Sequence, residues 1–137
     1  MIYHGNRFTF KDGVSQEEID SALESLRVQG RSIPSVRSFV VGRDHGGDFA
    51  YGAMFVIEDL AGYWEYLVHP AHRHTDRIGL PLLDRFTSFD ITDDLDPEVA
   101  ERIAELHQRR YDSDPELTRL VSDLGEYEGS AAPGSRS

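Results

Sequence analysis

The sequence contains no cysteine, a single lysine and no long run of apolar residues. The absence of cysteine excludes disulfide bonds, thiolate zinc sites and cysteine nucleophiles, so any chemistry must come from His, Tyr, Asp, Glu, Arg, Asn or Ser. No apolar run approaches the ~20 residues that a membrane-spanning helix requires, and the chain does not open with a signal-peptide pattern. We therefore expect a soluble, cytoplasmic protein.

Charge is distributed unevenly along the chain. The formal net charge is −11, and the only lysine is Lys11. Nucleic acids and anionic membrane surfaces require clustered Lys and Arg, so neither is expected as a partner. The segment from Asp93 to Glu128 holds 12 acidic and 4 basic residues. The acidity therefore belongs mainly to the C-terminal part of the chain.

A chain of 137 residues is long enough for one domain with a proper core and an appendage. We expect a domain over residues 1–92 and an acidic helical extension over residues 93–128. The remaining residues, 129–137, are small and polar in composition, which predicts a flexible tail.

The opening stretch Ile2–Phe10 alternates in the manner of a strand. One face carries two polar residues, His4 and Asn6, among apolar ones. A helix is predicted next, starting at a capping box between Ser15 and Glu18 and ending near Gly30.

Three further strands and one interrupted helix complete the predicted domain. The strands are expected at Val36–Val41, Phe49–Asp59 and Asp84–Thr92. Between the last two, Asp59 caps a helix, and Pro70 begins a second helical piece that runs to about Gly79. This order is that of the ferredoxin-like β-α-β-β-α-β motif, an α+β fold with both helices on one face of a four-stranded antiparallel sheet.

The other face of such a sheet has no helix to cover it. An exposed apolar sheet face usually finds a partner subunit, so we expect a homodimer formed through it. The extension carries two predicted helices, which open at Asp96-Pro97 and Asp114-Pro115. These helices are a solvated face, a cover for the cavity mouth, or arms that embrace the second subunit.

The most distinctive short segment is YWEYLVHPAH, which spans residues 63–72. The spacing of His69, His72 and His74 does not place all three on one face of a helix, which argues against a metal site. His69 is expected to satisfy free amides at the start of the second helical piece. His72 is either a packed core histidine or a base, since an imidazole titrates near neutral pH.

Several of these segments together resemble the stress-responsive dimeric α/β-barrel (Dabb) family. They are the strand with an early His, GVSQEEID, IPSVRSFVVGRD, IEDLAGYWEYLVHPAH and the strand ending in FDIT. The resemblance covers residues 1–92 and implies a ferredoxin-like protomer that pairs sheet to sheet into a barrel-like dimer. It also implies a cavity between the sheet and the helices of each protomer.

The resemblance also implies roles for particular residues. A plant member of the family closes a polyketide chain without a cofactor; its base corresponds to His72 and its orienting tyrosine to Tyr66. Its strand histidines correspond to His4 and to Tyr51, so this chain departs from the pattern at Tyr51. If the strand faces hold, His4, Asn6 and Tyr51 line the same cavity as substrate-binding groups.

Three functions follow as alternatives. The first is a cofactor-free enzyme, similar to polyketide cyclases, in which His72 acts as base and Tyr66 as acid on a small apolar or phenolic molecule. The second is a non-catalytic stress-response or ligand-binding dimer. The third is a cofactor-free monooxygenase, because related monooxygenases share the architecture.

Overall fold

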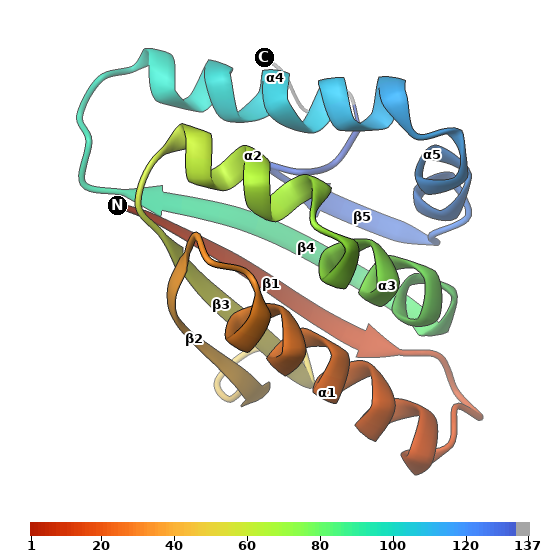
Figure 1. Cartoon of the computed structure of the whole chain (residues 1–137). Coiled ribbons are helices and arrows are strands. Elements are labelled where there is room, and N and C mark those ends of the chain that lie inside the picture. Colours follow the sequence, from red (N-terminus) through yellow and green to blue (C-terminus); the bar gives the residue numbers. More distant parts are fainter. Residues whose placement is uncertain (134–137) are drawn as a thin grey trace.

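The computed structural model describes residues 1–133 as one sheet covered by helices on one side (Figure 1). The strands are β1 (Ile2–Phe10), β2 (Val36–Arg43), β3 (Tyr51–Ile57), β4 (Leu83–Thr92) and β5 (Glu126–Gly129). The helices are α1 (Gln16–Ser32), α2 (Leu60–Val68), α3 (Pro70–Gly79), the 3-10 turn η1 (Leu80–Leu82), α4 (Glu98–Ser113) and α5 (Pro115–Ser122). The predicted α+β, ferredoxin-like architecture with a helical extension is confirmed.

The sheet has five strands in the order β2-β3-β1-β4-β5. The first four pair antiparallel, as predicted. The prediction of only four strands was wrong, because β5 pairs parallel with β4. The segment EYEG that forms β5 is short and largely polar, and it lacks the apolar alternation that would mark a strand in the sequence.

The helix starts predicted from the sequence are capped by side-chain hydrogen bonds. Ser15 and Glu18 form both hydrogen bonds of the capping box at the start of α1. The Asp59 side chain accepts from the amide of Gly62 and begins α2. The Nδ1 atom of His69 accepts from the amide of Ala71 at 3.0 Å, and this caps α3 just ahead of Pro70. The structural role expected of His69 is thus observed.

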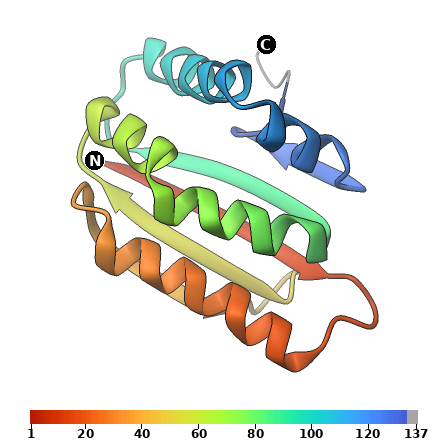
Figure 2. The same cartoon turned by 45° about the vertical axis from the view of Figure 1, so that its right-hand side comes forward.

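All helices of the described residues lie on the same side of the sheet, and both views show this (Figures 1 and 2). On the opposite face, Tyr3, Val40 and Ile91 are 40%, 64% and 59% exposed. The uncovered apolar face predicted from the strand pattern is therefore present. No helix within residues 1–133 is long and apolar enough to cross a membrane.

The extension docks on the domain through ion pairs to α3. Arg73 lies 3.3 Å from Asp114, and Arg77 lies 2.6 Å from Glu116. A buried pair joins Arg110 of α4 to Asp76. Helix α4 also lies alongside α2 (Figure 1). The extension thus lies beside α2 and α3 on the helical side of the sheet, and some of its side chains line the cavity of the same chain (Figures 1 and 2).

Residues 129–133, the described part of the tail predicted to be flexible, contact strand β4. Ser130 and Ala131 both hydrogen-bond to Ser88. Ala131 is buried, and its carbonyl accepts from the hydroxyl of Tyr111. Residues 134–137, on which the same prediction falls, lie outside the described residues.

Candidate functional site

The break between α2 and α3 brings Tyr66 and His72 together. Because His69 and Pro70 start a new helix, the last turn of α2 and the first turn of α3 face each other. The rings of Tyr66 and His72 stack with centroids 4.5 Å apart and planes 24° apart. Spacing in the sequence alone does not require this contact, which the family resemblance had implied.

His72 is held as a neutral imidazole with one nitrogen available. Its Nδ1 lies 3.2 Å from the carbonyl oxygen of Leu67. A carbonyl can only accept, so Nδ1 carries the proton and Nε2 carries the lone pair. Burial, then the positive charge of Arg110, lowers the pKa of His72 well below its ordinary value. At neutral pH the ring is therefore neutral, with an unprotonated Nε2.

The hydroxyl of Tyr66 is buried and lacks a hydrogen-bond partner within residues 1–133. The residue is 0% exposed, and the Asn6 side chain, which acts to lower the pKa of Tyr66, does not meet the hydroxyl in hydrogen-bonding geometry. Burial, followed by the charge of Asp76, raises its pKa, so the hydroxyl keeps its proton. An unpaired buried hydroxyl destabilises the fold, and such an exception calls for an explanation.

Asp76 and Arg110 form a buried ion pair beside His72. Asp76 Oδ1 lies 3.9 Å from His72 Nε2, one helical turn along α3. Burial raises the pKa of Asp76, although the charge and hydrogen bond of Arg110 act to lower it. The pair places one positive and one negative charge beside His72.

A second polar cluster surrounds His4 on the sheet side. Strand register sets His4 opposite Asp90, and His4 Nδ1 lies 2.9 Å from Asp90 Oδ1. The Tyr63 hydroxyl lies 3.0 Å from the same oxygen and 2.8 Å from His107 Nε2. The Ser130 hydroxyl donates to Asp90 Oδ2 at 2.6 Å. This cluster thus joins β1, β4, α2 and the extension.

The protonation states of this cluster follow from burial and charge. Burial would raise the pKa of Asp90, but the charge and hydrogen bond of His4 and the hydrogen bond of Ser130 leave it lowered. Burial and the charge of His4 lower the pKa of His107 to about 3. Asp90 is therefore an anion, and His107 is a neutral imidazole at neutral pH.

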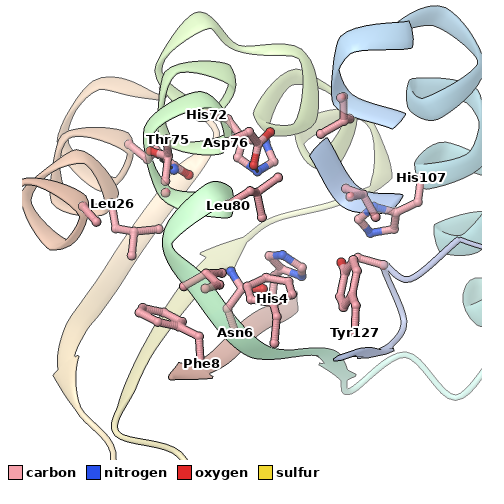
Figure 3. A pocket seen from close by; sticks show the side chains of 18 of the residues that line it. His4, Asn6, Phe8, Leu26, His72, Thr75, Asp76, Leu80, His107 and Tyr127 are labelled. Atoms are coloured by element: carbon pink, nitrogen blue, oxygen red, sulfur yellow. Dashed lines mark hydrogen bonds and ion pairs between the residues drawn. The ribbon is translucent and has the colours of Figure 1, made fainter. Parts of the chain in front are cut away.

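His72 with its neighbours, and His4 and His107 of the second cluster, line one cavity of about 70 Å³ (Figure 3). His72 and Asp76 enter it from α3, His4 and Asn6 from β1, and His107 and Tyr127 from the extension. Apolar side chains including Phe8, Leu26 and Leu80 form much of the remaining wall. A space of 70 Å³ holds several water molecules or a small organic molecule, given about 10–15 Å³ for one water.

Four of the five predicted site residues lie at this cavity. His4, Asn6, Tyr66 and His72 line it. Tyr51 does not: its ring packs against Phe8 and Phe10, with Arg43 over its face. It shares a sheet face with His4, as predicted, but the cavity lining at this end of the sheet comes from Phe8 and Phe10, against which Tyr51 packs. The cavity is also smaller than the few hundred cubic ångströms that a polyketide would require.

The comparisons with known proteins agree with this architecture. The pattern that defines the Stress responsive A/B Barrel Domain (Dabb) matches residues 2–93. The chain belongs to this family. A Dabb family protein from Mesorhizobium loti, with a ferredoxin-like fold, is 25% identical; the match covers 68% of this chain and 96% of that one, with a TM-score of 0.60. No curated protein matches the chain.

Two more distant structures share the Dabb fold. A dimeric ferredoxin-like protein of unknown function from Thermobifida fusca is 22% identical; the match covers 66% of this chain and 89% of that one, with a TM-score of 0.61. A hydroxynitrile lyase from Passiflora edulis is 14% identical; the match covers 69% of this chain and 96% of that one, with the same TM-score. At these identities the likeness shows the fold alone.

Sequence reasoning missed the partners of the predicted Dabb site residues. Asp76 stands four positions after His72, a spacing that places both on one face of a helix. His107 and Arg110 stand three apart on the buried stripe of α4, where polar residues signal a site or a buried pair. Asp90 had no local signal, because only the register of β1 with β4 sets it opposite His4.

Proposed function

We propose that this Dabb protein is a cofactor-independent enzyme that moves protons on a small carbonyl compound held in the cavity. The observation that carries this proposal is the pairing of a neutral His72 with the unpaired hydroxyl of Tyr66 at the same cavity. A lone pair on nitrogen and a free hydroxyl donor are the two groups that enolate chemistry requires.

The step that these groups support is proton abstraction beside a carbonyl. The bond between hydrogen and carbon breaks, the proton moves to Nε2 of His72, and the electron pair moves to the carbonyl oxygen. The Tyr66 hydroxyl donates to that oxygen as negative charge develops. Such a donor stabilises the transition state most where water is excluded, as in this buried cavity.

The size of the cavity favours a substrate smaller than a polyketide chain. Sites for drug-sized ligands usually measure about 300–1,000 Å³, whereas this cavity measures about 70 Å³. Proton abstraction beside a carbonyl, as expected from the resemblance, is retained as the reaction type, but a short ketone or aldehyde suits the space better than a tetraketide.

We further propose that the protein forms a homodimer through the open sheet face. The exposed side chains of Tyr3, Val40 and Ile91 lie on that face, and a fold relative is described as dimeric. Burying such a face is the usual reason for pairing. The helices leave it free in residues 1–133 (Figure 2).

The alternative is a non-catalytic dimer whose cavity holds a ligand or only packs. Incubation in D₂O with a set of short ketones, aldehydes and 2-oxoacids, followed by mass spectrometry, separates the two. The enzyme predicts deuterium uptake in at least one compound, about 100-fold faster than in buffer, and loss of this uptake in folded His72→Gln. If no compound takes up deuterium faster than in buffer, the enzymatic function is contradicted and the non-catalytic dimer remains. The oxygenase alternative stays a prediction that an oxygen electrode tests.

A further inference from the structure

The cluster around Asp90 fixes which nitrogen of His4 faces a bound molecule. Asp90 is ionised and can only accept hydrogen bonds, so the Nδ1 atom of His4 must carry a proton towards it. His4 also lines the cavity. Its Nε2 is therefore the nitrogen left for a molecule bound there.

Two side chains of the extension complete this cluster. The Ser130 hydroxyl donates to the second oxygen of Asp90 at 2.6 Å. Tyr63 donates its proton to Asp90, so the 2.8 Å contact between Tyr63 and His107 Nε2 requires His107 to be the donor. Asp90 and Tyr63 are thus each held from the extension as well as from the domain.

Both clamping residues lie beyond the part of the chain that matches the family. The match ends at residue 93, whereas His107 belongs to α4 and Ser130 follows β5. Their segments reach the cavity beside the sheet, as His107 and Tyr127 show in Figure 3. The domain alone therefore supplies His4, Asp90 and Tyr63 but not the groups that hold the last two.

We infer that His4 is a second acid–base group of the cavity, opposite His72, and that the extension positions it through His107 and Ser130. The acid–base role of His4 rests on the proposed function, whereas its positioning by the extension does not. After His72 has removed a proton from carbon, His4, which for this step carries a proton on Nε2 as well as on Nδ1, delivers the Nε2 proton to another atom of the bound enolate and keeps the one on Nδ1. The bonds made and broken balance as a proton shift within one molecule, and solvent returns the proton from His72 to His4. The hydrogen bond made by one ring nitrogen decides which nitrogen carries the proton, so the groups that hold Asp90 and Tyr63 also position the His4 ring.

The positioning role is tested on the full chain by proton NMR of ¹⁵N-labelled histidine side chains. Neighbours that bear on the His4 ring are Asp90 from β4, Tyr63 and Tyr66 from α2, His72 from α3 and His107 from α4. The wild type is expected to show a protected proton on Nδ1 of His4. Its exchange with water should accelerate about tenfold relative to core amides in Ser130→Ala and His107→Leu.

Matched variants distinguish a role in positioning the His4 ring from a role in attaching the extension to the domain. Ser130→Thr and His107→Gln keep a donor at each position and should restore the slow exchange, while Ser122→Ala, an exposed serine of the extension, should change nothing. A proton found on Nε2 rather than Nδ1 of His4, or equal exchange in all variants, overturns the inference.

The acid–base role is tested with a compound that takes up deuterium in the assay above. His4→Gln should keep the uptake that His72 causes but lose at least about 100-fold in formation of the rearranged product. Wild-type product formation in His4→Gln overturns this part. If the wild type takes up no deuterium from any compound, the proposed function is wrong. The NMR experiment still tests whether the extension positions the His4 ring.

Discussion

His72 stacks on Tyr66 at 4.5 Å, although six positions and a helix break separate the two residues. The break at Pro70 is what makes this contact possible, because a continuous helix would carry positions 66 and 72 to different faces. The segment that looks like a helix boundary is therefore also the segment that builds the candidate site. The helix boundary is observed, whereas the reactive role of this segment stays a proposal.

The buried histidines predict a loss of stability in mild acid. His107 binds a proton near pH 3 in the folded protein but near pH 6.5 when unfolded, and the pKa of His72 is lowered in the same direction. Between those pH values the unfolded chain binds more protons, so the free energy of unfolding rises with pH and this contribution is complete above pH 6.5. Each histidine contributes up to about 1.4 kcal/mol per pH unit.

Urea denaturation at several pH values between 4.5 and 6.5 checks this dependence. His107→Gln should reduce the slope of stability against pH by about 1.4 kcal/mol per unit. His45→Gln, an exposed histidine, should leave the slope unchanged. An unaltered slope in His107→Gln would show that this side chain is not a buried neutral imidazole.

The open sheet face predicts a dimer that a single charge disrupts. Sedimentation of the wild type should give twice the 15.5 kDa of one chain. Ile91→Asp places a charge at a 59% exposed position near the end of β4, on the face proposed as the interface, and should give monomers. Leu95→Asp is the control: Leu95 is 93% exposed but lies outside the strands and should leave the dimer intact. A monomeric wild type contradicts the proposed assembly.

The pair between Arg110 and Asp76 should behave as a buried ion pair. Arg110→Leu leaves the Asp76 carboxylate buried without its partner, which typically costs about 3–5 kcal/mol. Removing both charges in Arg110→Leu with Asp76→Leu should recover much of that loss, since an apolar pair of similar volume is often neutral.

The exposed pair between Arg102 and Glu98 is the natural comparison. Arg102→Ala should change the free energy of unfolding by no more than about 1 kcal/mol. Chemical denaturation of the three variants measures these differences. Equal effects of Arg110→Leu and Arg102→Ala would mean that the extension does not dock on α3 as described.

The sequence allowed much of the domain to be predicted because its signals are local. The alternation that places His4 and Asn6 inside, the capping box at Ser15 and the helix start at Pro70 each involve neighbouring residues. The family resemblance added the pairing of Tyr66 with His72, which spacing alone left open.

The remaining parts of the site depend on contacts between distant segments. The carboxylate that holds His4 is 86 positions away in the chain, and strand register alone makes them partners. The apolar stripe of α4 predicted that the helix docks, but not the surface on which it docks. The strand β5 had no signal, because its pairing with β4 stabilises a segment with weak strand propensity.

If the cavity is kept for a ligand and not for packing, the Tyr66→Phe variant should not lose stability. The Tyr66 hydroxyl is buried without a hydrogen-bond partner in the described chain. Its removal should leave the free energy of unfolding unchanged or raise it by up to about 1 kcal/mol, because a group that destabilises the fold is retained for function. A loss of about 2 kcal/mol or more in urea denaturation would show that the hydroxyl is satisfied in the folded protein and would contradict the account.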